Sequence, residues 1–75
     1  MEDKDLELIA RLQGRDAELD QLWREHLELE AALEAMNQRL YLTAEEQVER
    51  KRLQKLKLAG RDRIEAILAG HRQQG

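Results

Sequence analysis

The chain has 75 residues, with 13 Lys or Arg against 16 Asp or Glu, and a formal net charge of −3 at pH 7. It contains no Cys and no Pro, which excludes disulfide bonds and thiolate metal sites. A chain of this length forms at most one domain, and a core of this size supplies roughly 3–5 kcal/mol unless disulfides, a metal or association help. Association is therefore the expected aid to stability.

The charges are divided between the two parts of the chain. Residues 1–49 hold 14 acidic and 5 basic side chains, whereas residues 50–75 hold 2 acidic and 8 basic side chains. This division favours two helices, one acidic and one basic, folded back on each other. No apolar run approaches the roughly 18 residues that cross a bilayer, and the N-terminus is acidic where a signal peptide would be basic. We therefore expect a cytoplasmic protein without a membrane partner.

The first segment, residues 1–14, has helical apolar spacing at Leu6, Ile9 and Leu12. Gly14 interrupts it, and Asp16 could cap a new helix. The chain either hinges near Gly14 or continues as one helix to Leu40. Leu12 and Leu19 lie on either side of the glycine and are seven residues apart, so the heptad spacing is kept across it. This favours a continuous or slightly kinked helix. Residues 1–14 would then form a helical overhang beyond the hairpin.

A heptad pattern of apolar residues follows. One series recurs every seven residues and the other interleaves with it at steps of three and four: Leu12, Leu19, His26, Leu33 and Leu40, with Leu8, Leu22, Leu29 and Met36. This is the spacing of a coiled-coil seam. Ile9 and Trp23 widen the apolar stripe, as expected for a helix buried in a bundle.

The next signal is a turn. Thr43-Ala44-Glu45-Glu46 has the form of a capping box, in which the Thr43 hydroxyl accepts from the Glu46 amide and the Glu46 carboxylate accepts from the Thr43 amide. A second helix should begin here. Its apolar residues fall near one face: Val48, Leu53, Leu56, Gly60, Ile64, Ile67 and Leu68. Gly70 is the expected stop, followed by a flexible tail at residues 71–75.

These elements predict an all-α, coiled-coil-like antiparallel two-helix hairpin over residues 15–70, expected to dimerise into a four-helix bundle. Helices of matched length joined by a short link pair positions whose numbers sum to about 86. The predicted hairpin core is Leu19, Leu22, Trp23, Leu29, Leu33, Met36, Leu53, Leu56, Gly60, Ile64 and Ile67. Gly60 falls opposite His26 and Trp23, so we expect it to make room for the indole, and Gly60→Leu to destabilise the hairpin.

The same residues resemble a known family. Residues 15–19 (RDAEL), 22–26 (LWREH), 41–46 (YLTAEE) and 51–64 (KRLQKLKLAGRDRI) are similar to the small bacterial YdcH-like family, domain-of-unknown-function family 465. The likeness covers about residues 12–69, and its most specific part is Arg61-Asp62-Arg63-Ile64. The resemblance implies a helical hairpin and no established activity, catalytic residue or cofactor.

Catalytic and metal sites are not expected. His26 in the seam is typical of a packing or register residue, and His71 lies too far along the hairpin to share a metal with it. General acid–base chemistry needs a pocket that perturbs carboxylates, and a two-helix hairpin offers little concavity. We therefore predict that the protein is not an enzyme and uses no cofactor.

Two binding functions stay open. The preferred one is a protein–protein interaction or scaffolding module that forms a homodimer, or docks a helical segment of another protein, through an interaction face at Leu27, Val48 and Leu58. The alternative is a nucleic-acid-binding accessory protein whose basic second helix follows a phosphate backbone. Its contact residues would be Arg50, Lys51, Arg52, Lys55, Lys57, Arg61 and Arg63. Acidic residues on the facing helix would cancel much of this field.

Overall fold

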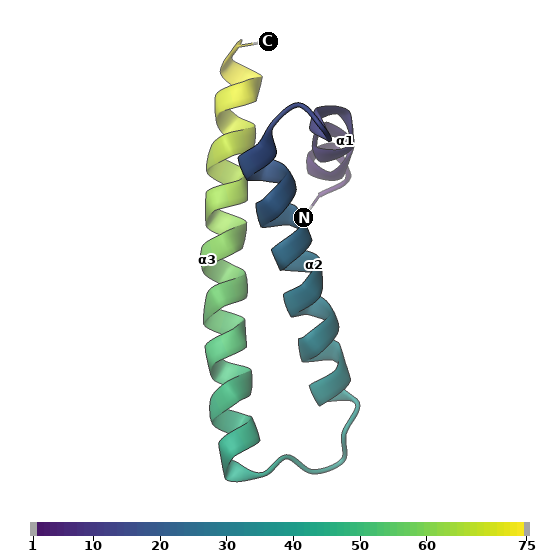
Figure 1. Ribbon diagram of the computed structural model, residues 1–75, viewed down its shortest axis with the longest axis vertical. Helices are drawn as coiled ribbons and strands as arrows, with labels where there is room; N and C mark the ends of the chain where they lie inside the picture. The colour runs from purple at the N-terminus through teal and green to yellow at the C-terminus, as the bar shows by residue number, and fades with distance from the viewer. Residues whose placement is uncertain (1, 75) are drawn as a thin grey trace.

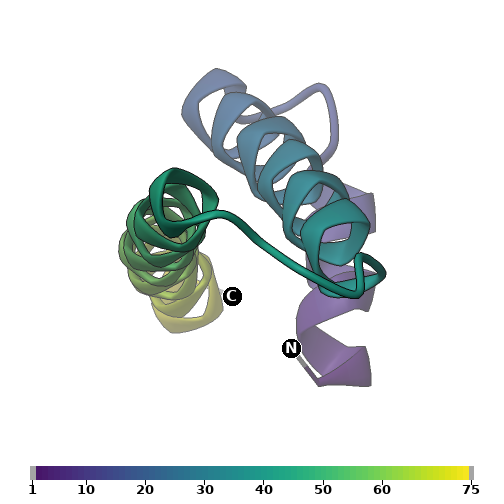
Figure 2. The same ribbon diagram turned by 90° about the horizontal axis from the view of Figure 1, so that it is seen from below.

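Three helices follow one another in the structure, a computed structural model that describes residues 2–74: α1 (Asp3–Leu12), α2 (Ala17–Asn37) and α3 (Ala44–Gln74). α2 and α3 lie side by side and antiparallel, which confirms the all-α hairpin (Figure 1). α1 is seen nearly end-on in the same view, because it crosses the hairpin axis near the end where α3 finishes. The view from below shows α1 against one side of the hairpin (Figure 2).

The capping box at the start of α3 forms as predicted. The Thr43 backbone N–H donates to Glu46 Oε1 at 3.1 Å, and the Glu46 backbone N–H donates to Thr43 Oγ1 at 3.1 Å. Each side chain therefore satisfies an amide that the first helical turn leaves without a partner. Arg39, in the link, forms an ion pair with Glu46. The connection is thus joined to the first turn of α3 by side-chain contacts.

The first segment does not continue into α2, so the preference for one continuous helix is wrong. α1 ends at Leu12, and Gly14 adopts a φ of +80°, in the left-handed region that glycine enters without steric cost. The Gly14 amide donates to Asp20 Oδ2 at 3.0 Å. Asp16 begins α2 as its N-cap, accepting from the Leu19 amide at 3.1 Å. The chain turns sharply at Gly14, and α1 packs across the hairpin instead of overhanging it.

α2 ends earlier than the heptad pattern suggests. Its last residue is Asn37, and the link to α3 runs through residues 38–43. Leu40, the last position of the predicted seam, is 89% exposed, and the neighbouring Tyr41 is 83% exposed. The seven-residue spacing therefore extends one step beyond the helix that it describes, because Leu40 has no facing element to pack against.

α3 passes through Gly70 without stopping, so the predicted helix end there is wrong. The helix continues to Gln74, and the expected tail at residues 71–75 is helical as far as the structure describes it, while Gly75 lies outside the described residues. The reason is that the last turn has partners. His71 Nε2 lies 3.0 Å from Asp16 Oδ2, and Arg72 forms an ion pair with Asp5.

Among the described residues, two of the three polar contacts between α2 and α3 agree closely with the predicted register, and the third joins two exposed, flexible side chains, Arg63 and Glu18, whose numbers sum to 81. Lys57 Nζ lies 3.7 Å from Glu30 Oε1, and Arg50 Nε donates to Asn37 Oδ1 at 3.1 Å. The residue numbers of both pairs sum to 87, within one residue of the expected value. The sequence therefore predicts the relative position of the two helices correctly.

The buried core lies where all three helices meet. Its members are Ile9, Leu19, Ile64 and Leu68. Leu19, Ile64 and Leu68 come from the hairpin and are fully buried, whereas Ile9 comes from α1. Leu68 and Ile9 were not among the predicted core positions, because the heptad pattern contains no information about where α1 packs. The packing of α1 on the hairpin buries Ile9 to 6% exposure, and removing one such side chain from water contributes about 2 kcal/mol.

The other predicted core positions are buried to different degrees. Leu33 is also buried, at 6% exposure. The half-buried positions are Leu22, Trp23, Leu29, Met36, Leu53, Gly60 and Ile67. Leu56 is 46% exposed, so its assignment to the core is wrong. It lies on a side of the hairpin that α1 does not cover.

We expect Thr43→Ala to lower the free energy of unfolding by about 1 kcal/mol, because the Glu46 amide loses its acceptor. Thr43→Ser keeps the hydroxyl and is the matched control. Urea unfolding followed by circular dichroism measures both variants. An unchanged midpoint for Thr43→Ala would contradict a stabilising capping box.

The contact between Asp16 and His71 predicts a pH dependence. The hydrogen bond from His71 holds the pKa of Asp16 below its usual value, and the Leu19 amide acts in the same direction. A carboxylate with a lowered pKa stabilises the folded state above the pKa of the unfolded chain, about 4. This stabilisation is lost as the pH falls through the lower pKa of the folded state.

Asp16→Asn keeps a capping side chain and removes the carboxylate. Between about pH 5.5 and about pH 3, its free energy of unfolding should therefore fall less than that of the unchanged protein. Urea unfolding at both pH values provides the comparison. Equal decreases in the free energy of unfolding of the two proteins would show that the Asp16 carboxylate does not contribute to the pH dependence of stability.

Candidate functional site

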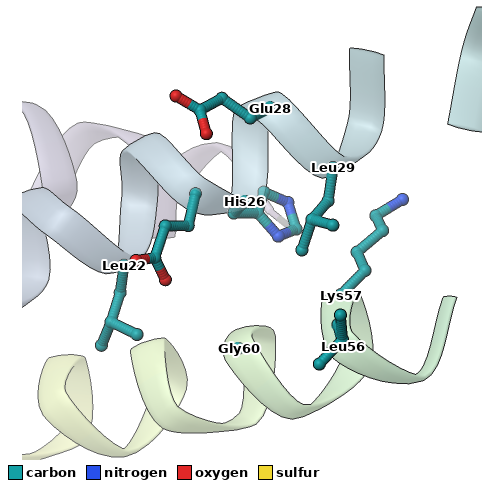
Figure 3. A pocket seen from close by; sticks show the side chains of 8 residues that line it. Leu22, His26, Glu28, Leu29, Leu56, Lys57 and Gly60 are labelled. Carbon is teal, nitrogen blue, oxygen red and sulfur yellow. The ribbon is translucent and has the colours of Figure 1, made fainter. Parts of the chain in front are cut away.

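An apolar groove lies between α2 and α3, on the side of the hairpin away from α1. Its volume is about 330 Å³, and its apolar lining is Leu22, Leu29, Leu56 and Gly60. Figure 3 shows Leu22, His26 and Leu29 on α2 facing Leu56, Lys57 and Gly60 on α3. Two half-buried leucines, one exposed leucine and a glycine without a side chain therefore leave an open apolar depression in the middle of the hairpin.

His26 forms part of the groove wall. Its side chain is 5% exposed and stacks on Trp23, with ring centroids 5.4 Å apart and planes inclined by 14°. Nε2 lies 3.0 Å from Glu30 Oε1 and donates to it, because the carboxylate can only accept. Nδ1 is buried and has no hydrogen-bond partner among the described residues. The contacts of His26 are those of a packing residue, as the sequence suggested.

The two edges of the groove carry opposite charges. Glu25 and Glu28 line it from α2, and Lys57 lines it from α3. The whole helices differ in the same way, since α2 has six acidic and one basic side chain and α3 has five acidic and eight basic ones. Between them, Arg63 of α3 donates to Glu18 of α2 at 3.0 Å. The groove thus has one acidic edge and one basic edge.

Gly60 does not accommodate the indole, so that part of the sequence interpretation is wrong. Trp23 instead lines a hollow between α1 and α2, together with Leu6 and Ile9. A Cβ added at Gly60 would meet no heavy atom within 4 Å. The predicted clash of a larger residue with Trp23 therefore has no basis, although the register from which it was inferred is right. The indole lies beside α1, whose position could not be predicted from the sequence.

The predicted interaction face does not form one continuous hollow. Leu27, Val48 and Leu58 are exposed, at 45%, 69% and 57%. Leu27 lines the hollow beside α1, whereas Leu58 lines a different one with Leu33. Val48 lies ten residues before Leu58 and is rotated about 80° from it around α3. Leu56, which the sequence assigned to the core, is the exposed leucine that lines the apolar groove.

Most of the basic residues proposed to contact nucleic acid have partners within the protein. Lys57 and Arg63 pair with carboxylates of α2, and Arg50 donates to Asn37. Arg52 pairs with Glu49, and Arg61 with Glu65. Lys51 and Lys55 are exposed and have no ion pair in the part of the chain that the structure describes. Exposed pairs of this kind contribute about 0–1 kcal/mol each, but they reduce the positive field of α3.

Within residues 2–74, no three His, Asp or Glu side chains come together as a metal site would require. None of the described helices is both long enough and apolar enough for a membrane crossing. The polar side chains nearest the groove are Glu25, Glu28, His26 and Lys57. They could orient a polypeptide that occupies the groove.

The fold and the groove define a small all-α protein built on an antiparallel helical hairpin with one open apolar side. A family model described as protein of unknown function (DUF465) matches residues 19–68. The chain therefore belongs to this family, as its resemblance to the family predicted. No curated protein and no solved structure matches the chain. The matched segment contains most of α2, the capping box and α3 through Leu68, whereas α1 lies outside it.

The open space at Gly60 predicts that Gly60→Ala raises the free energy of unfolding by about 0.5–1 kcal/mol, because alanine favours the helix and meets no neighbour. Gly14→Ala is the contrasting variant. It should lower stability by about 1 kcal/mol, since its φ of +80° is unfavourable for any residue with a Cβ. Thermal unfolding measures both changes, and a loss of stability in Gly60→Ala would contradict the open space at Gly60.

Proposed function

We propose that this protein is a protein–protein interaction module that pairs with a second copy of itself through the apolar groove, forming a four-helix bundle. The observation that supports the proposal is the groove itself, in which Leu56 is 46% exposed beside Leu22, Leu29 and Gly60. More than half of the Leu56 side chain is already covered within one copy, so covering the rest contributes about 1 kcal/mol. A chain of this length gains substantially from such burial, because its own core is small.

Charge complementarity favours a second copy as the occupant. A symmetric dimer brings the same surface of both copies together. If the two-fold axis runs parallel to the hairpin, the acidic α2 of each copy lies over the basic α3 of the other. The alternative axis, perpendicular to the hairpin in the interface plane, would place α2 over α2 and α3 over α3. The opposite charges at the two edges of the groove, Glu25 and Glu28 against Lys57, favour the first arrangement.

A helix from a different protein is the competing occupant of the same groove. Such a helix would present apolar residues at steps of three and four to Leu22, Leu29 and Leu56. Nucleic-acid binding is less well supported, because five of the seven basic residues proposed for it have partners within the protein. The proposal assigns the protein no catalytic role.

Leu56→Ser tests the proposal, with Leu58→Ser as the matched control. Both leucines are exposed on α3, at 46% and 57%, but only Leu56 lines the groove. We expect Leu56→Ser to weaken dimerisation by at least about tenfold, the equivalent of 1.4 kcal/mol, and Leu58→Ser to leave it unchanged. Sedimentation equilibrium at micromolar concentrations measures the dissociation constants.

The outcomes separate the competing surfaces. A dimer weakened by Leu58→Ser and not by Leu56→Ser would place the interface on the opposite side of α3. A folded monomer at all concentrations tested would exclude self-association and leave the groove to a different helix. Circular dichroism verifies that both variants retain their helices.

A further inference from the structure

A second hollow lies at the end of the molecule where α1 meets the last turns of α3. Its volume is about 670 Å³, within the range of small-molecule sites. It does not coincide with the groove between α2 and α3. Its lining residues are Lys4, Glu7, Leu8, Arg11, Leu12, Arg15, His71 and Arg72.

The lining of this hollow is strongly cationic. Four of its side chains carry a permanent positive charge, and only Glu7 is acidic. Lys4, Arg11 and Arg15 form no ion pair with any residue in the described range 2–74, whereas most basic side chains of α3 do. The whole chain carries a net charge of −3. A local concentration of unpaired cations in an acidic protein attracts an anion to this position.

Contacts among the three helices hold part of the lining in place. Asp5 of α1 pairs with the Arg72 guanidinium, which holds the pKa of Asp5 below its usual value. Asp16, the N-cap of α2, contacts the His71 ring at 3.0 Å. These carboxylates offset part of the charge, but they also orient two of the donors. Arg11 has no such contact and faces the hollow from α1.

Part of the lining of the hollow is apolar. Leu8 and Leu12 line it, are half-buried, and pack against the core. Lys4 and Arg11 lie four and three residues from Leu8 on α1, which places all three on one face of the helix. A ligand with an apolar part and a charged part would fit this arrangement better than a simple ion.

We propose that this hollow binds a phosphate ester that carries two or more negative charges. Each arginine presents a planar fork of N–H donors that matches two phosphate oxygens, and three of them line the hollow. The organic part of the ester rests on Leu8 and Leu12. The site depends on the turn at Gly14, because a helix continuing in line with α2 would carry Arg11 away from Arg72. It is independent of the proposed dimer.

The test compares two double variants with the same change in net charge. Arg11→Gln/Arg15→Gln removes two cations from the hollow, and Lys51→Gln/Lys55→Gln removes two exposed cations of α3 that lie outside it. The probes are ADP and phosphatidylcholine vesicles that contain phosphatidic acid. Isothermal titration calorimetry at fixed salt gives the affinity for ADP, and vesicle sedimentation gives the affinity for the lipid.

We expect Arg11→Gln/Arg15→Gln to weaken binding at least about tenfold and Lys51→Gln/Lys55→Gln to change it less than about twofold. A charge-assisted hydrogen bond to the ligand contributes more binding free energy than a distant, screened charge. Binding of ADP identifies a free phosphate ester as ligand, and binding of vesicles alone identifies a lipid headgroup. Both results support the phosphate site. Failure of both probes, or equal weakening by the two double variants, would overturn it.

Amide chemical shifts of the unchanged protein give a second measurement that does not depend on variants. Addition of ADP, or of the short-chain soluble phosphatidic acid if only vesicles bind, should shift the amides of Leu8, Arg11 and His71 most. Shifts concentrated on residues 50–57 would instead assign the binding to the basic face of α3 and overturn the proposal. Circular dichroism verifies that both double variants keep their helices.

Discussion

The antiparallel register between α2 and α3 is the constraint on which the rest of the structure depends. It brings Leu19 against Ile64 and Leu68, which form the fully buried part of the core. The same register places Glu30 beside Lys57, so the division of charge along the chain becomes a set of contacts between helices. These exposed pairs add little stability individually, but a shifted register would lose them together with the buried leucine and isoleucine contacts. The groove at Gly60 follows from this alignment as well.

The turn at Gly14 determines where α1 packs on the hairpin. A left-handed glycine and a capping aspartate two residues later separate α1 from α2. α1 then packs on one side of the hairpin and buries Ile9, while the opposite side keeps Leu56 exposed. Asp16 has two functions in this arrangement, since it caps α2 and contacts His71 at the end of α3. The two sides of the hairpin are therefore different surfaces.

Features that depend on local contacts could be predicted from the sequence. The capping box needs only Thr43 and Glu46, which are three residues apart, and the hairpin register follows from the position of the short link beside it. The position of α1 could not be predicted in this way, because Leu12 and Leu19 keep the heptad phase across Gly14 although the chain turns there. The end of α3 could not be predicted for a related reason: the partners of its last turn are on α1 and at the N-cap of α2. The exposure of Leu56 could not be predicted either, because it depends on which side of the hairpin α1 covers. The cationic hollow joins residues about sixty positions apart, so it has no local signal.

α1 has ten residues, and an isolated helix of that length is only marginally stable in water. Its helical structure therefore depends on the packing of Ile9 and on the contact between Asp5 and Arg72. Detachment of α1 and loss of its helix should occur as one cooperative local unfolding event, at a lower free energy than opening of the hairpin. The segment outside the matched family region would then be the least stable part of the molecule, able to open while α2 and α3 remain folded together.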